Sequence, residues 1–193
     1  MDKKQFEGFR SLATACRTVR RYKTESAPTR EELLSFVDIA RISPSAANRQ
    51  RLLYKIISGK EADGVFSMIS LGGYLPEGER PTFDMRPTAY IVILSRETEP
   101  DTNLAIDIGI CAESIVLAAR EAGFGSCMIR SFKREGILSL IKEEGLTPHL
   151  VIALGKPAED VKIIPMKNGD VKYYREGGCN LVPKRDLCDV VVD

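Results

Sequence analysis

The chain has 193 residues, a length that suits one domain with a substantial hydrophobic core. Its 28 Lys and Arg residues nearly balance 27 Asp and Glu residues, and the formal net charge is +1. This balance argues against a general nucleic-acid or membrane-surface binder, which would carry a large basic excess. We find no apolar run of membrane-spanning length and no signal-peptide core. We therefore expect a single domain over residues 1–193, located in the cytoplasm, with no nucleic-acid or membrane partner.

The inventory of reactive side chains excludes several common chemistries. Five cysteines, at positions 16, 111, 127, 179 and 188, form no Cys-x-x-Cys pair, and His149 is the single histidine. These residues provide no ligand set for a metal, so we predict no metal site and reduced thiols. We expect Cys111 to lie in the core, and Cys127 is better explained by packing than by a reactive role. The sequence also lacks the glycine-rich motifs of α/β-hydrolases, P-loop enzymes and Rossmann dinucleotide sites.

Hydrophobic periodicity predicts helices and strands that alternate along one domain. The expected helices cover residues 3–16, 30–41, 62–69, 102–122 and 133–144. The expected strands cover residues 52–57, 88–94, 125–129 and 149–154. Small residues along 102–122 permit close helix packing, and its apolar residues spread around the helix, which indicates burial on more than one side.

Residues 72–87 interrupt this pattern with a stretch rich in glycine and proline. Long loops of this kind are often lids or binding segments. A loop over the functional site and a simple connection are both consistent with the composition. Tyr74, Phe83 and Met85 are the side chains in it that could lie against a substrate.

Three arginines lie close together at positions 17, 20 and 21, directly after the first predicted helix. Basic side chains there would complement the negative end of the helix dipole. Three cations within five residues exceed that need, and Arg17, Arg20 and the Thr18 hydroxyl would together suit a phosphate dianion.

A second candidate segment follows the 30–41 helix. Small side chains around Ser45 let the backbone approach a flat ligand, and Asn48 and Gln50 offer amide groups of fixed geometry. Such a loop could hold a planar heterocycle with polar edges. Taken alone, it is better explained as a helix stop, because the residue before Pro44 is disfavoured in helical geometry.

The ordered combination of these segments resembles the nitroreductase-like flavoenzymes. In that family the first motif reads approximately Arg-Arg-Ser-x-Arg-x-Phe, and the second reads Ala-Arg-x-x-Pro-Ser-x-x-Asn-x-Gln-Pro. The residues that fit these motifs are Arg17, Thr18, Arg20 and Tyr22, then Ala40, Arg41, Pro44, Ser45, Asn48 and Gln50. The resemblance continues to Val182-Pro183-Lys184-Arg185 near the C-terminus.

The resemblance implies an α+β fold in which a central, mostly antiparallel or mixed sheet is flanked by helices. It also implies an intertwined homodimer with flavin mononucleotide (FMN) at the subunit interface and the 102–122 helix at its centre. The implied phosphate ligands are Arg17, Thr18, Arg20, Lys184 and Arg185. Contacts with the ring or ribityl chain are implied for Pro44, Ser45, Asn48 and Gln50, and backbone contacts near the reactive nitrogen for Met128, Ile129 and Arg130. Without the resemblance, Lys184 and Arg185 would simply form an exposed charged tail.

The chain departs from the family pattern at four places. Cys16 replaces the first arginine of the usual doublet, and Arg51 stands where proline is general. Leu52 stands where an aromatic residue is frequent, and Arg130 stands where glycine is common. Arg51 could alter the pocket edge or favour an anionic acceptor.

The function implied by the resemblance is that of an FMN-dependent NAD(P)H oxidoreductase. NAD(P)H would give hydride to the flavin in a ping-pong cycle, and a small-molecule acceptor such as a nitroaromatic or a quinone would follow it. The cofactor carries the redox chemistry, so no catalytic side chain is assigned. The alternatives are a non-catalytic flavin-binding protein (a store, sensor or redox partner) and a related flavin enzyme with an unusual substrate, such as an ene-reductase or dehalogenase.

Overall fold

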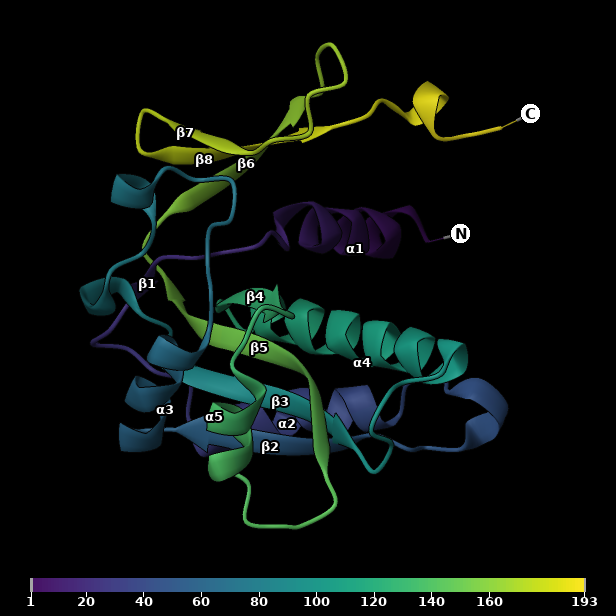
Figure 1. Ribbon diagram of the computed structural model, residues 1–193. Helices are drawn as coiled ribbons and strands as arrows, with labels where there is room; N and C mark the ends of the chain where they lie inside the picture. The colour runs from purple at the N-terminus through teal and green to yellow at the C-terminus, as the bar shows by residue number, and fades with distance from the viewer. Residues whose placement is uncertain (1, 193) are drawn as a thin grey trace.

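The computed structural model describes residues 2–192, and a five-stranded antiparallel sheet forms its centre (Figure 1). The long strand β5 pairs with β3 along one edge and with β4 and then β1 along the other, while β2 pairs with the far edge of β3. The predicted α+β class with a mostly antiparallel central sheet is therefore confirmed. The five strands are β1 (Tyr22–Lys23), β2 (Leu53–Ser58), β3 (Ala89–Ser95), β4 (Gly125–Ile129) and β5 (Thr147–Pro157).

Helices cover both faces of this sheet. The α-helices are α1 (Lys3–Ala15), α2 (Arg30–Arg41), α3 (Lys60–Val65), α4 (Thr102–Glu121) and α5 (Arg134–Ser139). Short 3₁₀ turns occur at Ala46–Asn48, Phe66–Met68, Glu77–Glu79, Phe83–Met85 and Leu187–Asp189. Helix α2 begins with a capping box in which the Glu32 N–H donates to Thr29 Oγ1 at 3.2 Å and the Thr29 N–H donates to the Glu32 carboxylate at 2.7 Å.

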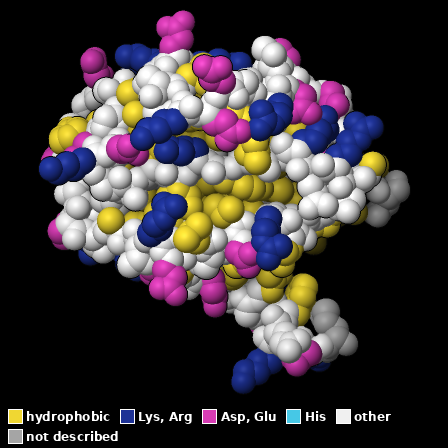
Figure 2. All heavy atoms as spheres, turned by 90° about the horizontal axis from the view of Figure 1, so that it is seen from below, with side chains coloured by type: hydrophobic (Ala, Val, Ile, Leu, Met, Phe, Trp, Pro, Cys, Tyr) yellow, Lys and Arg dark blue, Asp and Glu magenta, His cyan; other side chains and the backbone are white. Residues whose placement is uncertain are grey.

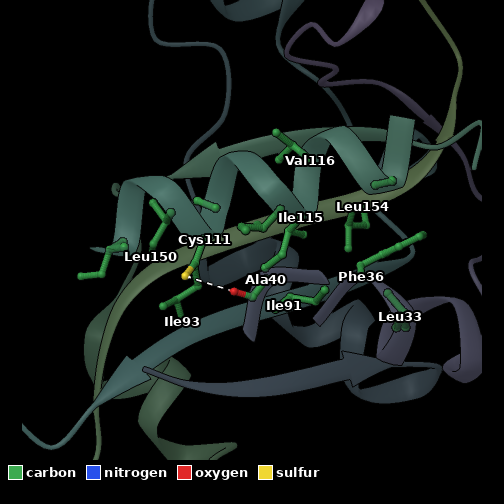
Figure 3. Packing of buried hydrophobic residues seen from close by; sticks show 14 of the residues in the cluster. Leu33, Phe36, Ala40, Ile91, Ile93, Cys111, Ile115, Val116, Leu150 and Leu154 are labelled. Carbon is green, nitrogen blue, oxygen red and sulfur yellow. Dashed lines mark hydrogen bonds between the residues drawn. The ribbon is translucent and has the colours of Figure 1, made fainter. Parts of the chain in front are cut away.

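The alternation of side chains along β3 creates two hydrophobic layers. Ile91 and Ile93 point to one face, where they pack with α2 and α4, and Val92 and Leu94 point to the opposite face, toward α3 and α5. Figure 3 shows Cys111 and other α4 side chains directed at this first layer, with the Cys111 thiol donating to the Ala40 carbonyl of α2 at 3.5 Å. All seven residues of β3 are buried, as expected for a central strand.

Helix α4 is long and apolar enough to cross a membrane by length and composition. The sequence predicts no apolar run of membrane-spanning length, and α4 is an exception to that prediction. Eight of its residues are buried inside the domain, including Ile115, Ala112 and Ala119. Its apolar character is accounted for by packing against α2 and the sheet.

The chain differs from the sequence prediction in several places. The helix predicted over residues 62–69 ends at Val65 and continues as a 3₁₀ turn, the short strand β1 was not predicted, and β5 is longer than expected. The helix predicted over residues 133–144 ends at Ser139, and Leu140 and Ile141 instead leave the helix and pack on the second hydrophobic layer. A three-stranded sheet that the sequence analysis did not predict follows β5. It contains β6 (Asp160–Pro165), β7 (Tyr174–Glu176) and β8 (Cys179–Lys184), with β8 parallel to β6 and antiparallel to β7. Helix α1 lies between this sheet and α4 (Figure 1).

We predict that Gly125→Ala destabilises the protein. A Cβ at Gly125 would lie 2.7 Å from Val19 Cγ2, and Val19 is buried where the segment after α1 crosses β4. Overpacking of this kind costs about 1–3 kcal/mol of unfolding free energy, measurable by urea denaturation at fixed protein concentration.

Gly64→Ala is the matched control, because a Cβ there would meet nothing within 4 Å and the residue is helical. It should leave stability unchanged or raise it by up to about 1 kcal/mol. Equal losses in the two variants would contradict the close approach of Val19 to β4.

Candidate functional site

A polar cavity of about 230 Å³ forms where the segment after α1 meets β4 and α4. Its lining combines Arg17, Thr18 and Met128, three of the predicted site residues, with Glu113 and Ser126. Thr18 pairs with Ser126 in an isolated parallel β-bridge, which holds the arginine segment against β4. The structure therefore brings the first motif and the β4 segment together.

Arg17 is only partly satisfied within the described chain. Its Nη2 donates to the Ala13 carbonyl at 2.8 Å, at the C-terminal end of α1, whereas its Nε is buried without a hydrogen-bond partner among residues 2–192. A buried guanidinium N–H without a partner is costly. An anionic ligand in this cavity would supply the missing acceptor.

Arg20 has a different environment. Its guanidinium stacks on the Tyr173 ring, 4.0 Å from the ring centroid. Among residues 2–192, no hydrogen bond or ion pair involves this guanidinium, whereas the Arg20 backbone N–H is bonded to a side chain, as described below. Burial raises the pKa of the nearby Cys127 thiol to about 11, and the Arg20 cation opposes this increase. Cys127 is buried in the second hydrophobic layer, which agrees with the packing role expected for it.

One carboxylate fixes the backbone beside Arg20. Glu159 Oε1 accepts hydrogen bonds from the backbone N–H groups of Arg20 and Arg21, and Glu159 Oε2 pairs with Arg175 of β7. The Glu159 side chain is 1% exposed and the Arg175 side chain 9% exposed. This buried ion pair therefore connects the arginine segment, the turn after β5 and the small sheet.

The second motif folds as a strained loop against α4. Three of its non-glycine residues, Ala47, Asn48 and Gln50, have positive φ of 51°, 52° and 49°. Such backbone needs support from its surroundings. The buried Asp107 of α4 provides it, because Asp107 Oδ1 accepts a hydrogen bond from the Ala46 N–H at 2.9 Å. The loop is therefore more than a simple helix stop.

Ser45 and Gln50 line a second, smaller cavity of about 120 Å³ with Asp107 and Cys111. Pro44 and Asn48 are exposed. Asp107 Oδ2 is buried with no hydrogen-bond partner among the described residues. Within one chain, this cavity shares no lining residue with the cavity around Arg17, so the two predicted groups of ligand contacts lie apart along α4.

Arg51 does not act as a free cation at the pocket edge. Its Nη1 and Nη2 donate to the Asp101 carboxylate at 3.0 and 3.1 Å, and Glu97 lies 3.5 Å from Nη1. Hydrogen bonds from Arg51 lower the pKa of Asp101 to about 2. Arg51 lines the cavity beside Ser45 and Gln50, and its pairing with two carboxylates reduces the positive charge it offers to an anionic acceptor. Arg51 also connects the loop to the N-terminus of α4.

The remaining predicted residues are placed differently from one another. Met128 is 40% exposed at the Arg17 cavity, Ile129 is buried in the second hydrophobic layer, and Arg130 is exposed just beyond β4. The Ile129 side chain is therefore not available to a ligand, and the residue is paired with Val151 of β5. Lys184 and Arg185 are exposed at the end of β8, and Arg185 Nη1 donates to the Asp189 carbonyl at 3.4 Å. Within residues 2–192, neither is hydrogen-bonded to the Arg17 cavity.

The sequence analysis missed five residues that shape this region: Ser126, Glu113, Asp107, Glu159 and Tyr173. Asp107 was detectable, since a carboxylate inside the apolar run of α4 needs a specific partner. Nothing local distinguishes Glu159 or Tyr173, because their roles depend on the fold of the small sheet.

Comparison with known proteins identifies the family. The profile described as "Nitroreductase family" matches residues 13–156. A nitroreductase-like protein from Streptococcus mutans superposes with a TM-score of 0.71 at 12% identity, over 97% of this chain and 98% of that one. An FMN-dependent nitroreductase from Clostridium difficile superposes with a TM-score of 0.60 at 22% identity, over 78% of this chain and 88% of that one. An oxidoreductase containing FMN gives 0.59 at 19% identity, over 77% and 76%. Comparison with curated protein sequences gives no significant match.

We predict that Glu159→Gln strongly destabilises the protein. The substitution leaves the Arg175 cation buried without its charge partner, and breaking a buried pair costs about 3–5 kcal/mol. Glu143→Gln is the control, since its ion pair with Arg96 is exposed and should contribute less than about 1 kcal/mol. Urea denaturation measures both. A loss for Glu159→Gln no larger than for the control would show that the pair is not buried in solution.

Proposed function

The chain belongs to the nitroreductase family, and from this membership we propose that it is an FMN-dependent oxidoreductase. It takes hydride from NAD(P)H and reduces a nitroaromatic, quinone or similar conjugated acceptor. The observation that supports this most directly is the Arg17 cavity, where a buried guanidinium N–H lacks an acceptor beside the exposed end of β4. Two of the similar solved structures are described as FMN-dependent or FMN-containing.

The residues present fit the phosphate end of FMN. Arg17 has an unsatisfied N–H, Arg20 presents a stacked guanidinium with free edges, and Thr18 adds a hydroxyl. Guanidinium groups bind phosphate through paired, charge-assisted hydrogen bonds. We propose that these three residues hold the phosphate, and that Lys184 and Arg185 join them through the assembly proposed below.

The loop of Pro44, Ser45, Asn48 and Gln50 would orient the flat ring and the ribityl chain. Its left-handed backbone exposes peptide groups that a regular helix would pair, and Asp107 holds it rigid. Met128 would supply an apolar contact and the backbone of Ile129 and Arg130 a polar one. When bound, FMN supplies the redox chemistry, accepting hydride from the nucleotide and passing electrons to the acceptor. We assign no side chain as a catalytic base.

We further propose that two chains assemble as a homodimer and complete the site. The structure leaves hydrophobic side chains exposed along the outer faces of three helices and the tail: Phe6, Phe9, Leu34, Ile39, Ile106, Ile110, Leu187 and Val192. Figure 2 shows hydrophobic side chains gathered in a band across one face, with charged side chains on both sides of it. Exposed apolar surface of this kind marks an interaction site.

The predicted ligand contacts lie in two separate cavities, and this supports a second copy of the chain as the partner on the apolar surface. Within one chain, the Gln50 loop and Arg17 line separate cavities, so no single chain surrounds a ligand that spans both. A partner copy could bring its Gln50 loop to this chain's Arg17, and its tail could bring Lys184 and Arg185. The same surface would then account for the exposed faces of α1, α2 and α4.

The flavin proposal predicts that the purified protein retains FMN with a perturbed visible spectrum after unbound flavin is removed. NADH or NADPH should bleach that spectrum without oxygen, and a quinone should restore it, with ping-pong kinetics in steady state. Arg17→Ala should weaken FMN binding roughly 10- to 150-fold, since it removes a charge-assisted contact. Arg96→Ala, at an exposed position, is the control.

Two outcomes would correct this proposal in different ways. Retained flavin that neither nucleotide reduces would favour a non-catalytic flavin-binding protein. If no flavin is retained at all, the family membership describes ancestry and not cofactor use.

The assembly proposal predicts a dimer by light scattering at micromolar concentration. Ile106→Glu should shift it toward monomer and release FMN together, because Ile106 is 54% exposed on α4 and a buried charge would oppose association. Val171→Glu, at a residue 60% exposed between β6 and β7, is the control and should change neither property. A monomer that still holds flavin would overturn the proposal.

A further inference from the structure

We propose that Tyr173 is a positioning residue that orients Arg20 for phosphate and connects the 72–87 loop to the same arginine. This inference rests on the proposed FMN function. It concerns a residue outside the matched family segment of residues 13–156, directly before strand β7 of the small sheet.

The first observation is the geometry of the stack. The Arg20 guanidinium lies 4.0 Å from the centroid of the Tyr173 ring, which covers one face of the cation. A planar guanidinium keeps its N–H groups in its own plane, so a ring on its face leaves those N–H groups free for a phosphate. A long, flexible arginine side chain is thereby held in one orientation before the ligand arrives, which lowers the entropic cost of binding.

The second observation is that both partners of the stack are anchored. Glu159 accepts hydrogen bonds from the backbone N–H groups of Arg20 and Arg21, and it pairs with Arg175, two residues after Tyr173. One buried carboxylate therefore fixes the arginine backbone and β7, the strand that begins directly after the tyrosine. The distance between ring and guanidinium is set by this framework.

The third observation connects the loop. The Tyr74 backbone N–H donates to the Tyr173 hydroxyl oxygen at 3.3 Å, and the two tyrosine rings lie 5.2 Å apart between centroids. The neighbouring Arg21 donates from Nη2 to the Glu79 carbonyl at 2.8 Å. The 72–87 loop is thus fastened twice to the arginine segment, so it is more than a connection between α3 and β3.

Together, these contacts assign separate roles to the ring and to the hydroxyl of Tyr173. The ring face orients Arg20, and the hydroxyl holds the loop at Tyr74. The tasks can be separated experimentally, because Tyr173→Phe keeps the ring and removes the hydroxyl, whereas Tyr173→Leu removes both. Tyr174→Leu is the matched control, since its neighbouring ring is 45% exposed on the small sheet.

The decisive measurement compares FMN with riboflavin, which lacks the phosphate, by titrating the apoprotein of each variant. Tyr173→Leu should weaken FMN binding by about 2- to 30-fold, the range expected for one cation–π contact, and leave riboflavin binding unchanged. Tyr173→Phe and Tyr174→Leu should keep wild-type affinity for both ligands. In an Arg20→Ala background, Tyr173→Leu should have no further effect on FMN, because its action passes through the arginine.

Hydrogen exchange of the apoprotein tests the contact between the Tyr173 hydroxyl and the Tyr74 amide without any flavin. The Tyr74 amide should exchange faster in both Tyr173→Phe and Tyr173→Leu than in the wild type, and at the wild-type rate in Tyr174→Leu. Unfolding curves for the same variants identify any general loss of fold, which would weaken FMN and riboflavin alike.

The binding results distinguish failure of the role proposed for Tyr173 from failure of the proposed function. A wild type that binds FMN, with Tyr173→Leu binding it equally well, overturns the orienting role and leaves the proposed function intact. An equal loss for FMN and riboflavin assigns Tyr173 a merely structural role and also overturns it. If the wild type binds neither FMN nor riboflavin, the proposed function is refuted. The role of Tyr173 in phosphate binding is then refuted as well. Unchanged Tyr74 exchange in Tyr173→Phe refutes the connection to the loop.

Discussion

The burial of α4 against the five-stranded sheet is the constraint on which the rest of the structure depends. Cys111 and Ile115 project from it into the hydrophobic layer above β3, and α2 packs beside it in the same layer (Figure 3). Because this packing fixes the axis and rotation of the helix, it also fixes the positions of the polar residues on α4. Asp107 meets the 43–50 loop, and Glu113 meets the Arg17 cavity. A core helix thus positions both groups of candidate ligand contacts.

The two groups differ in how they are held. The loop owes its shape to backbone geometry that few residues adopt without support, and a single buried carboxylate on α4 supplies that support. The arginine segment is extended and is held by pairing with β4 and by the buried Glu159 carboxylate. Each arrangement depends on a carboxylate inside the protein, Asp107 for the loop and Glu159 for the arginine segment. Leaving such a buried charge without its partner would cost free energy. We therefore expect the site to be rigid before any ligand binds.

The small sheet connects the later part of the chain to the arginine segment. The matched family segment ends at residue 156, one residue before the end of β5. After it, Tyr173 directly before β7 and Arg175 within β7 both contact the arginine segment or the carboxylate that fixes it. This part of the chain therefore places an aromatic ring against a cation of the first motif.

The sequence by itself determined the helices, the central strands and the nature of the candidate loops. Periodicity located α2, α4 and β3, because burial repeats with the geometry of each element, and the ordered motifs led to the family before any fold was known. The tertiary structure decided which side chains meet. Arg51 looked like a free cation until Asp101 and Glu97 were found beside it. Tyr173 and Glu159 had no local signal, since Arg20, the residue that both contact, lies about 140–150 residues away from them in the chain. Contacts over such separations depend on how sheets and helices close on one another, and hydrophobic periodicity carries no information about that.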